Sequence, residues 1–280
     1  MRYNMEIRYL ADPIRFQRMT TSELRQNMLV ENLFQTGELR LVYSDADRAI
    51  VGAAVPANKP LTLSGSKELA AEYFTERREI GIINIGEAGI VSVGEESFHL
   101  AHKEALYIGK GRHDIVFQSD STQKPAEFYL LSYPAHQAYP TRKVTQAQAN
   151  RRDLGSDAEC NKRTIFQYLR PGVLDTCQIV MGLTELAEGS VWNTMPPHTH
   201  ERRTEIYLYF DLSKNGLVFH LCGEPESTRH IVMHNKQVVL SPSWSIHAGV
   251  GTAHYTFIWG MGGENQDFDD MDDIDPVNLR

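Results

Sequence analysis

The chain has 280 residues, of which 41% are hydrophobic and 23% are charged. This composition is that of a globular protein with enough apolar side chains for one large core or two modest ones. No run of eighteen apolar residues occurs, and the N-terminal sequence lacks the apolar centre of a secretory signal, so we expect neither a membrane-spanning helix nor secretion. The formal net charge is −8 without a long basic segment, which makes nucleic acid a poor candidate partner.

The cysteines indicate the compartment. Cys160, Cys177 and Cys222 are widely spaced and form no CxxC pair. An odd, sparse set is not a disulfide framework and suits a reducing environment. We therefore expect a cytoplasmic protein.

In chain order, the sequence predicts two short helices followed by many strands. The helical patterns cover residues 22–30 and 66–73, the second opening on a serine that could cap it. Segments rich in β-branched and aromatic residues predict strands at 80–85, 89–93, 128–133, 206–210, 218–221, 237–240 and 255–259. Many short strands with close turn signals favour an antiparallel sandwich or barrel.

A weak internal repeat suggests two similar β domains. The sequence ERREI at 76–80 is matched by ERRTEI at 201–206, and apolar strand segments follow both. Residues 134–163 are polar and rich in turn formers, as expected of a linker. We predict an N-terminal domain over 1–133, a linker over 134–163 and a C-terminal domain over 164–280.

The sharpest chemical feature is the sequence MPPHTHERRTE at 195–205. His198 and His200 stand two apart, so on a strand their side chains leave the same face. Glu205 follows at an odd offset, and the charged segment between could form a turn that brings it beside the histidines. Glu201 is the alternative carboxylate, disfavoured because adjacent residues of a strand point to opposite faces.

A further histidine completes a candidate metal site. His247 follows a proline-initiated turn on a later segment, PSWSIH. Three imidazoles and one carboxylate suit zinc, iron, manganese, nickel or cobalt. With no redox partner evident, we expect one Zn²⁺ per chain, bound by His198, His200, Glu205 and His247.

These motifs resemble the two metal motifs of the cupin superfamily. Longer stretches, among them NTMPPHTHERRTE at 193–205, SPSWSIHAGVGT at 241–252 and FTERREIGIINIG at 74–86, are similar to the 5-keto-4-deoxyuronate isomerases of pectin breakdown. The resemblance implies a mainly β bicupin, with two jelly-roll β-barrel domains and a few short helices. It also implies a zinc-dependent homohexamer.

The resemblance further implies an intramolecular oxidoreductase, a ketol-isomerase. Its reaction converts 4-deoxy-L-threo-5-hexosulose uronate to 3-deoxy-D-glycero-2,5-hexodiulosonate. The N-terminal half resembles a degenerate copy: Glu76 and Glu79 lie where ligands would be, and His113 falls near the later histidine position, slightly out of register. We therefore expect a single metal site, in the C-terminal domain.

Substrate-binding residues are harder to select. Tyr207 and Tyr209 share the face of Glu205 on the predicted strand, and Tyr207 is the nearer. A substrate carboxylate would suit an arginine, and we favour Arg163 over the other candidates, which are Arg202, Arg203 and Arg229. The sequence does not identify the catalytic base. The acidic C-terminal residues 267–275 lack the pattern of an EF-hand, so we expect a solvated or interface-bound tail rather than a calcium site.

Two other functions remain open at this point. An iron-dependent cupin dioxygenase would use the same ligand types. A non-catalytic sugar-binding bicupin would bind the ligand without turnover.

Overall fold

A computed structural model describes residues 5–280; residues 1–4, with which the first predicted domain begins, lie outside the described residues. The chain divides into two compact units. Unit 1 comprises the described part of Met1–Arg8 together with Asn32–Ala149 and Tyr168–Val180. Unit 2 comprises Tyr9–Glu31, Asn150–Gln167 and Met181–Arg280.

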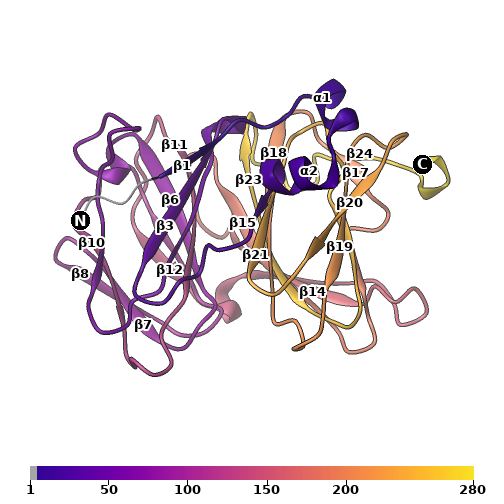
Figure 1. The fold of residues 1–280 in the computed structure, drawn as a ribbon. Helices are drawn as coiled ribbons and strands as arrows, with labels where there is room; N and C mark the ends of the chain where they lie inside the picture. Colours follow the sequence, from indigo (N-terminus) through magenta and orange to yellow (C-terminus); the bar gives the residue numbers. More distant parts are fainter. Residues whose placement is uncertain (1–4) are drawn as a thin grey trace. The chain divides into compact units, whose positions relative to one another are not determined.

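Unit 1 contains two β-sheets (Figure 1). The larger has seven strands in the order β1 (Glu6–Arg8), β3 (Leu39–Ser44), β4 (Ile50–Ala54), β11 (Phe128–Pro134), β6 (Arg78–Asn84), β9 (Ala105–Ile108) and β12 (Arg142–Val144). The smaller has four strands in the order β5 (Leu61–Leu63), β10 (Ile115–Ser119), β7 (Gly89–Val93) and β8 (Glu96–Leu100).

Unit 2 repeats this plan, which confirms the predicted duplication. Its seven-stranded sheet runs β13 (Asn150–Leu154), β14 (Arg163–Leu169), β15 (Val180–Leu186), β23 (Thr256–Gly263), β18 (Arg203–Phe210), β21 (Gln237–Ser241) and β2 (Leu29–Val30). Its four-stranded sheet runs β16 (Trp192–Asn193), β22 (Ala248–Gly251), β19 (Val218–Cys222) and β20 (Arg229–Met233). A short pair joins β17 (His198–Thr199) to β24 (Asp272–Asp273).

The mainly β, two-sandwich class predicted from the sequence is therefore confirmed, and all seven predicted strands are present. The boundaries differ from those predicted, because the 134–163 segment is not a plain linker. It contains β12, which pairs with β9 of unit 1, and β13, which pairs with β14. Residues 9–31 also group with unit 2 rather than with the N-terminal half.

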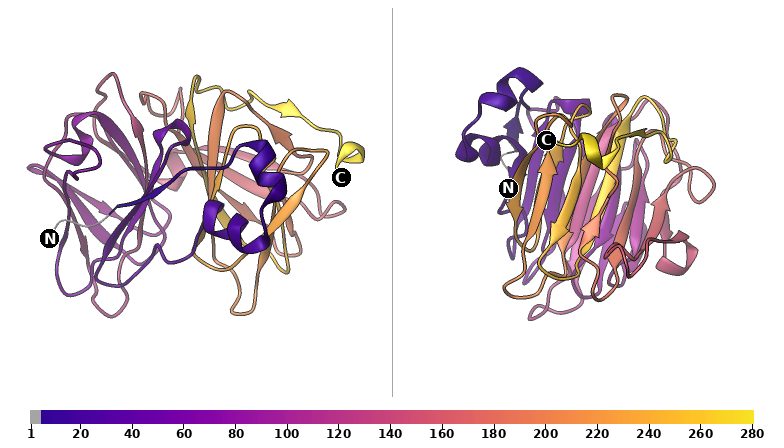
Figure 2. Two further views of the ribbon diagram at one scale, coloured as in Figure 1. Left: turned by 45° about the horizontal axis from the view of Figure 1, so that its top comes forward. Right: turned by 90° about the vertical axis from the view of Figure 1, so that its right-hand side faces the viewer.

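One predicted helix is present and the other is wrong. Helix α2 spans Thr21–Met28 and begins with a capping box between Thr20 and Glu23, after the one-and-a-half-turn helix α1 at Pro13–Arg18. Figure 2 shows both helices beside the orange strands of unit 2, and α2 contacts β20 and β21. Residues 67–70 form a turn and residues 72–73 a bend instead, since Ala70 has a φ angle of +46°, outside the helical region.

Short 3₁₀ segments complete the described secondary structure, at Ala46–Arg48, Phe74–Glu76, Gln146–Gln148 and Pro276–Asn278. No helix within residues 5–280 is both long and apolar enough to cross a membrane.

The interior of unit 1 is an apolar core. Ile80, Ile82, Val91 and Phe117 are fully buried in one hydrophobic cluster, and the Phe117 ring lies 5.4 Å from that of Phe128. Side chains at alternate positions of β6 thus fill the space between the two sheets. Unit 1 has the same sheet plan as unit 2, but apolar side chains fill the space between its sheets.

We expect Phe117→Ala to lower the free energy of unfolding by about 3–5 kcal/mol, because truncation removes buried apolar surface and leaves a cavity. Urea unfolding followed by fluorescence measures the loss. Phe219→Ala, which changes a 36% exposed ring, is the matched control and should cost about 0.5 kcal/mol or less. Equal losses of stability in the two variants would contradict the conclusion that packing of the Phe117 ring stabilises the core.

Candidate metal centre

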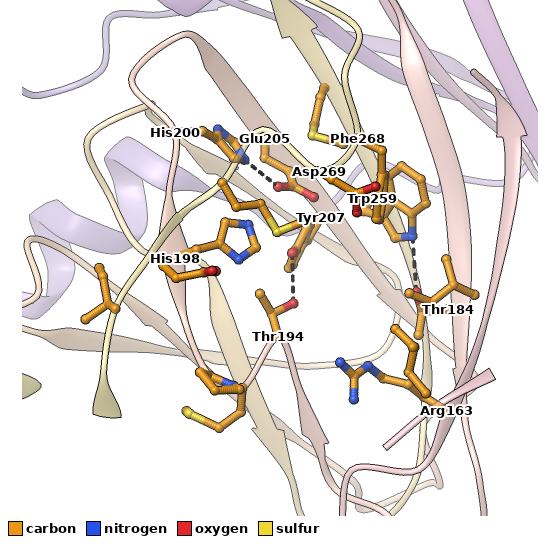
Figure 3. A pocket seen from close by; sticks show the side chains of 18 of the residues that line it. Arg163, Thr184, Thr194, His198, His200, Glu205, Tyr207, Trp259, Phe268 and Asp269 are labelled. Carbon is orange, nitrogen blue, oxygen red and sulfur yellow. Dashed lines mark hydrogen bonds and ion pairs between the residues drawn. The ribbon is translucent and has the colours of Figure 1, made fainter. Parts of the chain in front are cut away.

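Four side chains of unit 2 converge in the structure, and they are the four that the sequence selects. One ligand atom from each of His198, His200, Glu205 and His247 lies within 4.8 Å of every other, and all four residues are buried. The Glu205 Oε2 atom is 3.0 Å from His200 Nε2 and 2.9 Å from His247 Nε2. Figure 3 shows His198, His200 and Glu205 at one end of a pocket.

The local chain path explains the odd spacing between His200 and Glu205. Residues 201–202 form a turn, and the Arg203 N–H donates to the His200 carbonyl at 3.1 Å. Strand β18 then begins at Arg203, so that Glu205 points into the interior of unit 2. The alternative carboxylate, Glu201, is exposed and lies outside the group.

Backbone carbonyls orient two of the imidazoles. His200 Nδ1 lies 3.0 Å from the Arg203 carbonyl oxygen, and His247 Nδ1 lies 3.2 Å from the Ser245 carbonyl oxygen. A carbonyl can only accept, so each Nδ1 donates a proton to its carbonyl and each Nε2 is directed at the centre, where it can bind a cation once it is deprotonated.

The donor set fits a divalent cation. His247 Nε2 and His198 Nε2 lie 2.9 Å apart, a separation at which two lone pairs repel unless a proton or a cation lies between them. Three imidazole nitrogens and one carboxylate oxygen are ligands for first-row transition metals, and zinc takes them readily.

Burial and charge oppose each other at these side chains. Burial, reinforced by the neighbouring His247, lowers the pKa of His198 to about 3. Burial also opposes ionisation of His200, but its hydrogen bond to Glu205 prevails and the pKa is raised. Burial alone would raise the pKa of Glu205, yet the surrounding histidines hold it well below its usual range.

A cavity of about 630 Å³ opens beside the centre. Tyr207, Thr194 and Arg163 line it together with His198, His200 and Glu205. In Figure 3, Arg163 lies across the cavity from His200 and Glu205, with Tyr207 and Thr194 between them. The pocket therefore has a candidate metal site at one end and a guanidinium at the other.

The environments of Tyr207 and Arg163 differ. Burial, and then the charge of Glu205, raises the pKa of Tyr207 well above its usual value, so the phenol remains neutral. Burial lowers the pKa of Arg163, whose Nη1 donates to the Asn161 carbonyl at 2.8 Å. Within residues 5–280, the Arg163 guanidinium has no carboxylate within ion-pair distance.

The other predicted arginines have different surroundings. Arg202 forms ion pairs with Asp270 and Asp272, and the buried Arg203 donates to the Asp270 carbonyl at 2.9 Å. Arg203 reaches the edge of the pocket, but its Nη1 and Nη2 atoms donate to the C-terminal segment. Arg229 does not line the pocket; it donates to the Met19 carbonyl and lies over the Phe16 ring.

The acidic C-terminal segment lies against unit 2, and most of its carboxylates remain exposed to solvent, as expected. Asp269 pairs with Arg152 at 3.0 Å, and the Phe268 ring lies 5.1 Å from that of Trp259. Phe268, Asp269 and Asp273 line the pocket, and β24 pairs directly with the strand that contains His198. Ion pairs with Arg152 and Arg202, and hydrogen bonds from Arg203, hold this segment in place.

A buried polar layer in unit 2 was not predicted from the sequence. Asn193, Gly249 and His220 are cross-strand neighbours in the four-stranded sheet, and the Tyr209 hydroxyl approaches the side-chain-free position of Gly249. There it lies 2.8 Å from His220 Nδ1, while Asn193 Nδ2 donates to the Tyr255 hydroxyl at 2.6 Å. Tyr209 thus belongs to this layer and does not line the pocket.

The degenerate character of the N-terminal copy has a structural basis. Ile80 and Ile82 of β6 fill the unit 1 interior, as Glu205 and Tyr207 of β18 fill that of unit 2. Glu79 is buried, but its carboxylate accepts hydrogen bonds from the Tyr107 hydroxyl and from the N–H groups of residues 177–179. Glu76 pairs with Arg77, and His113 is exposed. Among residues 5–280, one group qualifies as a candidate metal site, and it lies in unit 2.

Metal removal should destabilise the protein. We expect the melting temperature to rise by roughly 5–10 °C when Zn²⁺ is added to chelator-treated protein at a hundredfold excess over Kd, because the ion binds only the folded arrangement of donors. Differential scanning fluorimetry measures the shift. Mg²⁺, which prefers oxygen ligands, is the control, and a Glu205→Gln variant should respond weakly. An identical melting temperature with and without Zn²⁺ would contradict the site.

A two-sandwich fold with buried histidine and glutamate donors in one unit defines a bicupin with a candidate metal centre. Solved structures support the fold. An IolB-like protein from Salmonella typhimurium aligns with a TM-score of 0.68 at 13% identity, covering 86% of this chain and 94% of that chain. Oxalate decarboxylase from Bacillus subtilis aligns with a TM-score of 0.58 at 11% identity, covering 86% of this chain and 78% of that chain.

The sequence comparison is more specific. The profile of the KduI/IolB family matches residues 28–276, and the chain belongs to this family. It is 52% identical over 276 residues to the 4-deoxy-L-threo-5-hexosulose-uronate ketol-isomerase of Lachnoclostridium phytofermentans, covering 99% of this chain and 100% of that protein.

Proposed function

We propose that the protein is a metal-dependent ketol-isomerase that converts 4-deoxy-L-threo-5-hexosulose uronate to 3-deoxy-D-glycero-2,5-hexodiulosonate in uronate and pectin breakdown. The observation that carries this proposal is the 52% identity over the full length to a relative with that named activity. The buried histidine and glutamate group at one end of the pocket supports it, because the reaction needs an electrophile beside a carbonyl.

The chemistry moves hydrogen between adjacent carbons of an α-hydroxy aldehyde. The barrier is the weak acidity of the C–H bond beside the carbonyl. A divalent ion held by His198, His200, Glu205 and His247 would supply a Lewis acid for the substrate oxygens. We propose Zn²⁺, one per chain, because the donor set suits zinc and isomerisation needs no change of metal oxidation state.

Tyr207 is proposed to bind the reacting end of the substrate. Its phenol lines the pocket and stays protonated, so it can donate a hydrogen bond to a substrate oxygen. A neutral donor stabilises negative charge as it develops on that oxygen and adds no second anion beside Glu205.

Arg163 is proposed to bind the substrate carboxylate. The open-chain substrate has its aldehyde at one end and its carboxylate at the other. The pocket has a matching polarity, with the candidate metal centre facing a guanidinium that has no carboxylate partner within residues 5–280. A planar guanidinium can bind a carboxylate through two parallel hydrogen bonds.

Assembly and location are proposed on separate grounds. A homohexamer follows from the resemblance to the uronate isomerases, and sedimentation analysis tests it. A cytoplasmic location follows from the sparse cysteines, which are free thiols in the structure.

The function is tested with purified, Zn²⁺-loaded protein and the keto-deoxyuronate, using proton NMR to follow loss of the aldehyde and an electrode to follow oxygen. Product formation without oxygen consumption is the expected result. Oxygen uptake by iron-containing protein would establish the dioxygenase instead. Thermal stabilisation by the uronate without any product would establish a sugar-binding protein.

A further inference from the structure

Thr194 has an unusual backbone conformation at the edge of the pocket. Its φ angle is +48°, and it is the β-branched residue among the nine non-glycine residues with positive φ in the described chain. A branched Cβ clashes with the backbone in this region, so the surrounding structure must hold the residue there. Strain of this kind tends to occur where a side chain is required in one particular direction.

The contacts of the preceding residue, Asn193, keep the backbone in this conformation. Asn193 is fully buried, pairs with Gly249 through the β16–β22 ladder, and donates to the Tyr255 hydroxyl at 2.6 Å. The chain is therefore fixed immediately before Thr194, and the strained residue turns its side chain towards the pocket.

The result is a pair of hydroxyl groups facing the cavity. Thr194 Oγ1 lies 3.2 Å from the Tyr207 hydroxyl oxygen, and both residues line the pocket (Figure 3). The Tyr207 ring is also enclosed by aromatic neighbours: its centroid is 5.0 Å from that of Phe257, 5.7 Å from that of His247 and 5.8 Å from that of His220. These contacts fix the ring, and its hydroxyl lies close to both Thr194 and Glu205.

The two hydroxyl groups share one chemical restriction. A phenol is a weak acid at neutral pH, and a threonine hydroxyl is a still weaker one. Each can pass a proton on only while it receives another. A pair of such groups moves a proton without holding a charge.

We propose that Thr194 and Tyr207 form a hydroxyl relay that transfers the proton between the two substrate oxygens during isomerisation. The substrate hydroxyl at C2 gives its proton to Thr194 Oγ1, Thr194 gives its own to the Tyr207 oxygen, and Tyr207 gives its own to the oxygen at C1. One O–H bond breaks and one forms at each residue, so both end unchanged, while hydrogen moves between C2 and C1 in the accompanying carbon step. This role rests on the proposed ketol-isomerase function.

The test compares three substitutions at Thr194 in the zinc-loaded enzyme. Thr194→Val keeps the shape and removes the hydroxyl; we expect kcat to fall about a hundredfold with KM changed less than about threefold. Thr194→Ser keeps the hydroxyl and should retain kcat within about threefold. Thr194→Gly relieves the backbone conformation, so we expect a higher melting temperature together with the low kcat of the valine variant. Thr164→Val is the matched control, because it removes the hydroxyl of a half-buried threonine on β14 that donates to Asp153 at 2.7 Å and does not line the pocket.

Combining substitutions separates a relay from two independent contacts. Tyr207→Phe should lower kcat, and adding Thr194→Val should lower it little further, because either change already breaks the same path. Metal content by elemental analysis and the melting temperature are measured for every variant, since they would reveal a merely structural loss.

Several outcomes would overturn the relay. These are wild-type kcat in Thr194→Val, a loss of kcat that only follows a loss of bound metal, or a lower melting temperature with unchanged kcat in Thr194→Gly. An active wild-type enzyme with any of these results removes the relay and leaves the isomerase function standing. A wild-type protein that does not turn over the uronate removes both.

Discussion

Replacing His247 with alanine should remove the metal and lower kcat/KM by about a thousandfold or more. His247 Nε2 is the donor nearest to both Glu205 and His198, so its loss opens the centre and leaves an incomplete ligand set. The stabilisation that a Lewis acid gives a developing negative charge amounts to several kcal/mol, and each 1.4 kcal/mol is about tenfold in rate. Elemental analysis should find about one ion per wild-type chain and almost none in the variant.

The control for this prediction is His254→Ala, which changes an exposed histidine of the same unit. It should retain the metal and full activity. Circular dichroism and the oligomeric state establish that the His247 variant is folded. Undiminished turnover in a folded, metal-free His247→Ala protein would disprove the metal mechanism.

Replacing Arg163 with methionine should raise KM for the keto-deoxyuronate by roughly a hundredfold while kcat changes much less. Methionine preserves much of the apolar volume of the side chain but supplies no donors to the carboxylate. Hydrogen bonds to charged groups contribute about 1.5–3 kcal/mol each, and a guanidinium can make two to one carboxylate. Initial-rate kinetics over a wide range of substrate concentration separates KM from kcat.

Arg163→Lys and Arg152→Met make this test specific. Lysine restores the charge without the planar pair of donors, so it should recover only part of the affinity. Arg152 also lines the pocket, but it is already paired with Asp269, so we expect a much smaller effect on KM. A larger rise in KM for Arg152→Met than for Arg163→Met would indicate that Arg152 binds the substrate carboxylate instead.

The sequence was sufficient to bring four residues together because the relevant signals are local. Because His198 and His200 are two residues apart, the sequence predicted that their side chains point the same way. The charged turn before β18 predicted that Glu205 lies beside them. His247 could be selected because it follows the turn that begins at Pro242, where the Ser245 N–H donates to the Pro242 carbonyl. The repeated ERR motif likewise indicated two similar β domains, whereas their strand order came only from the structure.

Features that depend on distant partners could not be predicted in this way. The Asn193–Gly249–His220 row exists only once three strands are in register, and none of these residues is distinctive alone. The strained φ of Thr194 leaves no signal in a single sequence. The predicted helix at 66–73 is wrong because Ala70 has a φ angle of +46°, which its high helix propensity gives no reason to expect.

The repeated sheet plan has a consequence for engineering. The half with the isoleucine-filled interior can be made more heat-resistant by repacking its aliphatic side chains, since no reacting group lies among them. The side chains that line the pocket of unit 2 offer no such freedom, because replacing them alters a donor, an acceptor or the space for the substrate. Variants selected by directed evolution for thermal stability should therefore carry most of their substitutions in unit 1 and few in the residues that line the pocket.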